Sequence, residues 1–125
     1  LIDRSFYLVG RLDASKTGVS GLRPKTIDEF TKTLDTSKPI FVLEHQPGEL
    51  KEEEKSGVDL SMAGHTHNGQ LFPGNLLVSL MWTNSYGHYQ SGDFHSIVTS
   101  GLGVWGPNMR IGTDSEIVII DVTFQ

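Results

Sequence analysis

Two histidines lie one residue apart in MAGHTHNGQ, residues 62–70, before a glycine and among small polar residues. These are His65 and His67, and a third histidine, His45, ends the apolar run PIFVLEH. The chain contains no cysteine, so any metal must take imidazole, carboxylate or amide ligands. Imidazoles suit Zn, Mn, Fe or Ni. We therefore treat His45, His65 and His67 as candidate metal ligands.

The spacing of His65 and His67 leaves two metal arrangements open. In an extended segment, residues i and i+2 point the same way and lie about 6.6 Å apart. Metal–nitrogen bonds are about 2 Å long, and paired catalytic metals lie roughly 3.5–4 Å apart. The rings of His65 and His67 can therefore chelate one ion or bind two adjacent ions. Gly64 and Gly69 would let the backbone bend closely around a ligand. In the alternative interpretation, both histidines only hydrogen-bond the backbone.

Three runs predict the strands that position these histidines: SFYLVG (5–10), PIFVLEH (39–45) and VDLSMAG (58–64). The last two are apolar enough for strands that are buried on both faces. His45 and His65 therefore follow two neighbouring strands, at the sheet edge where open α/β sheets place their sites. The polar segment between residues 11 and 24 predicts a long loop, in which Asp13 either faces the site or stabilises the loop.

Two short helices are predicted between the strands. TIDEFTKTL (26–34) has Thr26 at the N-cap and Glu29 three residues later, the spacing of a capping box. PGELKEEEKSG (47–57) predicts a second helix, whose acidic run we expect to be a solvated face.

Strand-like runs separated by glycines follow residue 72: GHYQSG, FHSIVTSG and EIVIIDVTFQ. We expect a mostly antiparallel carboxyl-terminal half, and a single α/β domain over residues 1–125. Asp93-Phe94-His95 spells an Asp-x-His ligand pattern, but His95 would share a strand face with Ile97. We interpret His95, and likewise His88, as structural.

The charge and hydropathy of the chain restrict its partners. The net charge is −5, and the ten Lys and Arg residues are scattered, which argues against nucleic acid binding. The longest apolar stretch, LLVSLMW, is far shorter than the roughly 20 residues that span a bilayer. We expect the chain as given to be soluble, and its abrupt start without Met suggests a fragment or a processed product.

Three blocks of the sequence resemble the carboxyl-terminal half of calcineurin-like metallophosphoesterases, in particular a bacterial branch of that family. The blocks are HQP at 45–47, GHTHNGQ at 64–70 and TSGLGVWGPNMRIGTDSEIVIIDV at 99–122. The resemblance implies a mixed sheet in a β-sandwich flanked by helices, with two divalent metals at the strand ends. It also implies that His45 and His65 bind one metal and His67 the other.

The resemblance further implies hydrolysis of a phosphate monoester, diester or phosphoanhydride in the full-length protein. The substrate would be a phosphorylated small molecule or a lipid-linked phosphate, and the full-length protein would be membrane-associated or exported. Asn68, Gln70, Trp105 and Arg110 are candidates for a substrate pocket. Asn68 replaces a glycine of many family members, a change that Asn tolerates because it accepts positive φ.

The family's amino-terminal blocks, D-x-H, G-D-x-x-D and G-N-H-D/E, do not precede the HQP and GHTHNGQ blocks in this sequence. Asp93-Phe94-His95 lies after GHTHNGQ, in the wrong order to replace the first of them. We therefore expect the chain alone to bind metal weakly and to be inactive. Two alternatives stay open: a non-catalytic carboxyl-terminal domain that forms a homodimer, or a complete protein with one metal held by His45, His65 and His67.

Overall fold

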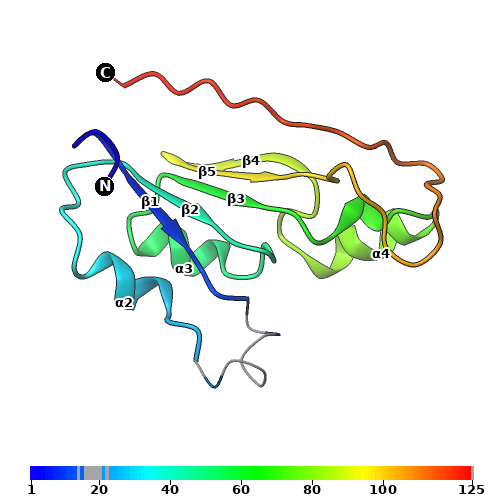
Figure 1. The fold of residues 1–125 in the computed structure, drawn as a ribbon, viewed down its shortest axis with the longest axis horizontal. Coiled ribbons are helices and arrows are strands. Elements are labelled where there is room, and N and C mark those ends of the chain that lie inside the picture. Colours follow the sequence, from blue (N-terminus) through cyan, green and yellow to red (C-terminus); the bar gives the residue numbers. More distant parts are fainter. Residues whose placement is uncertain (14, 16–20, 22, 125) are drawn as a thin grey trace.

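The computed structural model describes residues 1–13, 15, 21 and 23–124, and this part of the chain holds a mixed five-stranded sheet (Figure 1). Its strands are β1 (Tyr7–Gly10), β2 (Ile40–Leu43), β3 (Leu60–Ala63), β4 (Gly87–Ser91) and β5 (Phe94–Val98). The strand order is β1-β2-β3-β5-β4. Only β4 and β5 are antiparallel, and the other neighbours are parallel. The expected α/β class and the antiparallel carboxyl-terminal strands are confirmed.

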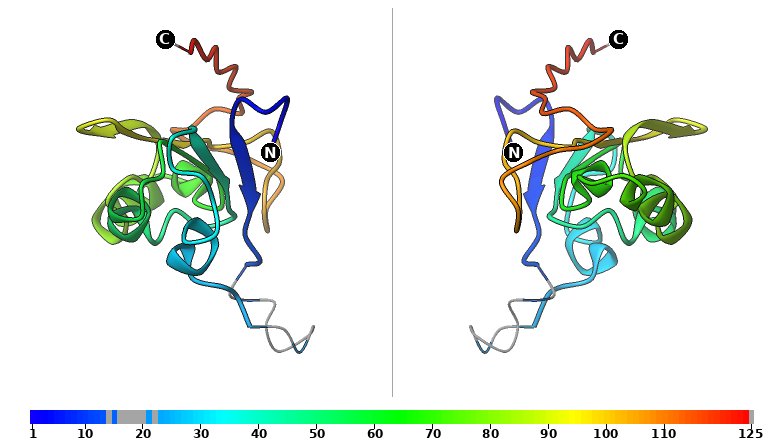
Figure 2. Two further views of the ribbon diagram at one scale, coloured as in Figure 1. Left: turned by 90° about the vertical axis from the view of Figure 1, so that its left-hand side faces the viewer. Right: turned by 90° about the vertical axis from the view of Figure 1, so that its right-hand side faces the viewer.

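Two short helices cover one face of the sheet, as both orientations of the molecule show (Figures 1 and 2). They are α2 (Ile27–Thr31) and α3 (Leu50–Lys55), and the predicted capping box between Thr26 and Glu29 is present at the start of α2. The hydrophobic core lies between these helices and the sheet. It is formed by Ile27, Ile40, Val42, Leu50, Val58 and Phe94.

The opposite face of the sheet is lined by the carboxyl-terminal segment (Figure 2). Phe6 contacts Phe41 and Phe124 there, with ring centroids 4.9 and 5.8 Å apart. The segment from residue 113 to 124 is extended but forms no strand within the described residues, contrary to the strand predicted from EIVIIDVTFQ. Its Ile117 and Ile119 are 74% and 84% exposed, because no neighbouring strand covers them in the described part.

A third helix, α4 (Gly74–Met81), was not predicted. None of its residues is buried, and large apolar side chains such as Leu77 and Leu80 are exposed. An amphipathic helix shows a 3.6-residue repeat of apolar residues, because one face is buried and the other is polar. Since α4 has no buried face, its sequence lacks this repeat. This explains why only strand-like runs were recognised after residue 72.

The acidic run of α3 also differs from its prediction. Glu52 and Glu54 are exposed, but Glu53 is fully buried. The expectation of a wholly solvated face is therefore wrong at Glu53, whose neighbours are described below.

Candidate metal centre

The structure brings His45 and His65 into direct contact. His45 follows β2 and His65 follows β3, and these strands are parallel neighbours. The Gly64 N–H donates to the His45 carbonyl, which joins the two segments beyond the strand ends. His45 Nε2 and His65 Nδ1 lie 2.9 Å apart, with the rings edge to face. The predicted convergence of these two histidines is confirmed.

The separation of the two nitrogens fits a shared metal ion. Metal–nitrogen bonds of about 2.0–2.1 Å, at angles between a right angle and a tetrahedral angle, place two nitrogens about 2.8–3.4 Å apart. Without a metal, the same distance fits an N–H···N hydrogen bond, in which one ring donates to the other. Imidazole pairs suit divalent transition metals, so the donor set of His45 and His65 fits such an ion.

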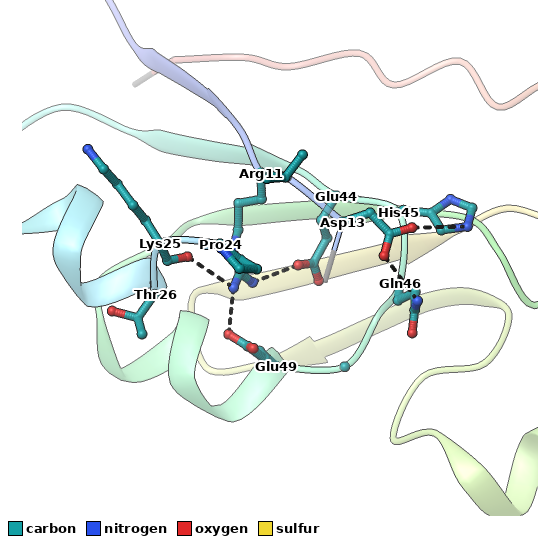
Figure 3. A pocket seen from close by; sticks show the side chains of 11 residues that line it. Arg11, Asp13, Pro24, Lys25, Thr26, Glu44, His45, Gln46 and Glu49 are labelled. Atoms are coloured by element: carbon teal, nitrogen blue, oxygen red, sulfur yellow. Dashed lines mark hydrogen bonds and ion pairs between the residues drawn. The ribbon is translucent and has the colours of Figure 1, made fainter. Parts of the chain in front are cut away.

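Asp13 is the carboxylate nearest to this pair. Its Oδ2 lies 3.7 Å from His45 Nε2, and its Oδ1 accepts hydrogen bonds from Gln46 Nε2 at 3.3 Å and from the Ser15 N–H at 2.8 Å. Figure 3 shows Asp13 between His45 and Gln46. The backbone hydrogen bond from Ser15 lowers the pKa of Asp13. Asp13 therefore both faces the histidines and organises its own loop.

Trp82 and burial shape the surroundings of His65. The Trp82 ring stands edge to face with the His65 ring, with centroids 6.2 Å apart. Burial lowers the pKa of His65, and charge on His45 lowers it further. A lowered pKa favours the neutral imidazole, which is the form that binds metals. Neither Trp82 nor Gln46 was singled out from the sequence, because their roles depend on contacts distant along the chain.

The loop after β3 is tightly turned rather than extended. His65, His67, Asn68 and Gln70 all have positive φ, between 49° and 68°, and His67–Gly69 forms the 3₁₀ helix η2. The prediction of an extended segment, in which His65 and His67 would point to the same side, is therefore wrong. The positive φ of Asn68 agrees with the tolerance expected of that residue. Several strained residues in one loop are common at functional sites.

His67 takes a different position from the other two histidines. Its Nδ1 is buried and has no hydrogen-bond partner among the residues that the structure describes, a feature that metal binding would explain. In the part of the chain that the structure describes, no group of three or more His, Asp or Glu side chains is arranged to hold one metal ion. The joint placement of His45, His65 and His67 around one ion is thus not observed.

Gly69 packs closely against the start of α4. A Cβ atom at Gly69 would lie 2.1 Å from the Asn75 backbone nitrogen and 2.3 Å from the Gly74 carbonyl carbon. Its φ is +73°, so glycine is required there on both counts. We expected Gly69 to let the backbone come close to a ligand. In the structure it lets the backbone come close to Gly74 and Asn75, the first residues of α4.

The loop between residues 100 and 113 is fixed by two side chains that were predicted to contact substrate. Gln70 is almost fully buried and bonds the backbone of Trp105 and Pro107. The Arg110 guanidinium donates to the backbone carbonyls of His67, Ser100, Gly101 and Gly103. These contacts favour a positioning role for both residues.

The other two substrate candidates differ in exposure. Trp105 is 65% exposed, so its ring is accessible from solvent. Asn68 is half-buried in η2, where the Thr66 hydroxyl accepts a hydrogen bond from its backbone N–H.

A pocket of about 290 Å³ opens beside His45 (Figure 3). Arg11 crosses it, donating to Glu44 and Glu49 at 2.8 Å, and lies 4.0 Å from buried Glu53. Burial, and then the charge of Glu53, raise the pKa of Glu44 to about 8. Burial also raises the pKa of Glu53. One guanidinium thus neutralises only part of the negative charge that three carboxyl groups can carry.

Curated proteins similar to this chain share one description. The chain is 43% identical over 96 residues to an uncharacterized metallophosphoesterase of Helicobacter pylori, covering 75% of this chain and 26% of the relative. It is 32% identical over 121 residues to an uncharacterized metallophosphoesterase of Aquifex aeolicus, covering 94% and 46%. A transmembrane protein with metallophosphoesterase domain from Danio rerio is 40% identical over 88 residues, covering 68% and 20%.

The chain thus spans between a fifth and just under half of the length of these relatives. No family model matches the sequence, and no solved structure matches the fold. In the described residues, every helix is too short or too polar to cross a membrane.

Proposed function

We propose that this chain, which belongs to the metallophosphoesterase family, supplies part of the metal site of an enzyme that hydrolyses phosphate esters or phosphoanhydrides. The observation that carries the proposal is the 2.9 Å separation of His45 Nε2 and His65 Nδ1. The two histidines follow the carboxyl ends of adjacent parallel strands, and the distance between their nitrogens allows both to bind the same ion.

The proposed site holds two divalent metals, drawn from Mn, Fe, Zn and Ni. His45 and His65 would hold one ion, and His67 would hold the other. The buried Nδ1 of His67, which has no hydrogen-bond partner in the described part of the chain, supports this assignment. Divalent ions supply Lewis acidity towards phosphoryl oxygens and lower the pKa of bound water. The chain's own residues position the ligands: Gln46 and Ser15 fix Asp13 beside His45, and Arg110 and Gln70 hold the strained loop that carries His67.

The chain alone is proposed to be inactive and to bind metal weakly. The relatives are more than twice as long as the matched region, which supports further ligands elsewhere in the protein. The alternative with one ion held by three imidazoles lacks support, because the described residues contain no such three-ligand group.

The full protein is inferred to add a second sheet against the face lined by the carboxyl-terminal segment, which would complete the β-sandwich. Exposed Ile117 and Ile119 support this inference, since a long apolar extended segment is normally covered. A homodimer of the chain would cover the same side chains, and its mass at increasing concentration distinguishes the two arrangements.

The proposed substrate is a phosphorylated small molecule or a lipid-linked phosphate. The pocket beside His45 and Asp13 supports access of such a substrate to the proposed metals. Because Glu44 and Glu49 line the same pocket as Arg11 and Lys25, the attraction for an anionic group would come from the bound metals. The net charge of −5 argues against a nucleic acid substrate. One relative is named a transmembrane protein, which supports membrane association of the full-length protein.

The test uses the full-length protein with Mn²⁺ and the chromogenic substrates p-nitrophenyl phosphate and bis-p-nitrophenyl phosphate. We expect metal-dependent hydrolysis that His45→Ala and His65→Ala each reduce at least about 100-fold, because loss of a ligand empties or distorts the site. His88→Ala, a histidine on a distant strand, is the matched control and should retain activity. Hydrolysis that survives both His45→Ala and His65→Ala would refute the proposal.

A further inference from the structure

Helix α4 lies beside the candidate metal centre and contributes no side chain to the hydrophobic core. None of its residues is buried, and other elements form the core cluster of the described residues. Figure 1 shows α4 beyond the end of β3, apart from α2 and α3. Since most of the stability of a short helix comes from tertiary packing, the contacts at the two ends of α4 determine its position.

Both ends of α4 lie close to candidate metal ligands. At its start, the helix packs against Gly69 of η2, in the loop of His67. At its end, the Trp82 N–H donates to the Val78 carbonyl at 3.2 Å, which ties the indole to the last turn. The helix thus connects the loop of His67 to Trp82.

The Trp82 indole contacts the segments of both paired histidines. Its ring stands nearly perpendicular to the His65 ring, at an interplanar angle of 82° with centroids 6.2 Å apart, which is the geometry of an edge-to-face aromatic pair. A Cβ atom at Gly48 would lie 3.4 Å from Trp82 Cζ3, so the indole also packs against the backbone shortly after His45. One side chain therefore bridges the segments that follow β2 and β3.

His65 depends on such contacts for its orientation. It is exposed, so its side chain can adopt several staggered rotamers, and its φ of +68° is unusual for a residue other than glycine. In the structure its Nδ1 lies 2.9 Å from His45 Nε2, a separation that fits a shared ion. Holding an exposed ring in one orientation before the ion binds lowers the entropic cost of binding.

We propose that Trp82 is a positioning residue of the metal centre, which holds the His65 imidazole in the orientation that binds the ion. A role in the core does not explain Trp82, because it is only half-buried and its aromatic partner is the exposed His65. The inference rests on the proposed function, since it takes His65 as a metal ligand. It adds a residue that acts on the metal through His65.

The test compares the Co²⁺ affinities of the metal-free full-length protein and its variants, measured by the visible absorption of bound Co²⁺. Trp82→Leu should weaken binding about two- to tenfold, the affinity equivalent of one aromatic pair. Trp82→Phe keeps an aromatic ring and should restore most of the affinity. Leu80→Ala, at a position of α4 that is 85% exposed, is the control and should bind Co²⁺ as the unchanged protein does.

A second comparison separates positioning of His65 from a general effect on folding. Trp82→Leu is combined with His65→Ala, and the affinity is compared with that of His65→Ala alone. Without His65, loss of Trp82 should weaken Co²⁺ binding no further, because the two residues act through one interaction. Equal weakening with and without His65, or an unchanged affinity in Trp82→Leu, would overturn the proposal.

Failure of the proposed function gives a different result. An unchanged Co²⁺ affinity in His65→Ala would refute the ligand role of His65, and this inference with it. Co²⁺ binding that depends on His65, without hydrolysis of bis-p-nitrophenyl phosphate, would refute only the reaction. The comparison with and without His65 would then still decide whether Trp82 positions the imidazole.

Discussion

Gln70 and Trp105 are joined by reciprocal hydrogen bonds: Gln70 Nε2 donates to the Trp105 carbonyl at 2.7 Å, and the Trp105 N–H donates to Gln70 Oε1 at 2.8 Å. Gln70 follows the histidine loop, whereas Trp105 lies 35 residues later. The side-chain amide of Gln70 thus donates to and accepts from the backbone of one residue, as a residue of a neighbouring β-strand does. The arrangement couples the position of His67 to that of the carboxyl-terminal loop.

Gln70→Ala should destabilise the chain by about 1–3 kcal/mol, because it leaves backbone groups of Trp105 without their partners. Urea unfolding followed by circular dichroism measures this loss. Gln90→Ala is the control, since Gln90 is exposed and its side chain donates a local hydrogen bond to the Gly92 carbonyl. Equal stabilities of the two variants would show that the bonds between Gln70 and Trp105 contribute little.

The positions of His45 and His65 could be predicted because they depend on local patterns. Each histidine follows a short apolar run, and two parallel strands that are neighbours bring their carboxyl ends to the same edge. The capping box of Thr26 and Glu29 is equally local, since four consecutive residues define it. Local signals of this kind located the strands of the site and one of its helices.

The loop that carries His67 could not be predicted, because its shape depends on distant partners. Arg110 donates to the His67 carbonyl from 43 residues away, and α4 packs against Gly69. These contacts stabilise left-handed backbone at residues that would otherwise avoid it. Burial of Glu53 was missed for the same reason, since its position beside Arg11 follows from the packing of α3 on the sheet.

Gly69→Ala should be far more destabilising than Gly92→Ala. Both glycines have positive φ, so alanine costs about 1–2 kcal/mol at either position. Only Gly69 adds a steric clash, with the backbone of Gly74 and Asn75, whereas the space around Gly92 is open. Thermal unfolding of both variants measures the difference, and similar unfolding temperatures would contradict the close packing of η2 against α4.

Glu53 should make the chain less stable as the pH rises. Its pKa is raised by burial, so the folded state binds more protons than the unfolded state above the ordinary glutamate pKa of about 4.3. Stability is then fully present below that value and falls as the pH rises through the raised pKa, by at most about 1.4 kcal/mol per pH unit. Glu53→Gln removes this charge and should flatten the fall in stability.

Urea unfolding between pH 4.5 and 8 measures the effect at Glu53. Glu52→Gln changes an exposed glutamate on the same helix and is the control for the loss of a surface charge. An unchanged pH profile in Glu53→Gln would show that this carboxyl keeps the same proton affinity in both states.

Asp13→Asn should weaken metal binding at His45 and His65 by about tenfold or more, because it removes a negative charge beside the nitrogen that faces the proposed ion. The change keeps the shape of the side chain and removes a negative charge that lies 3.7 Å from His45 Nε2. Competition between the chain and a chromogenic chelator for Zn²⁺ measures the affinity, with His88→Ala added to both proteins so that the facing rings of His88 and His95 do not contribute. Asp28→Asn, on the exposed side of α2, is the control for net charge. If Asp13→Asn and Asp28→Asn bind Zn²⁺ equally, Asp13 stabilises only its own loop through Ser15 and Gln46, and its position beside His45 has no influence on the metal.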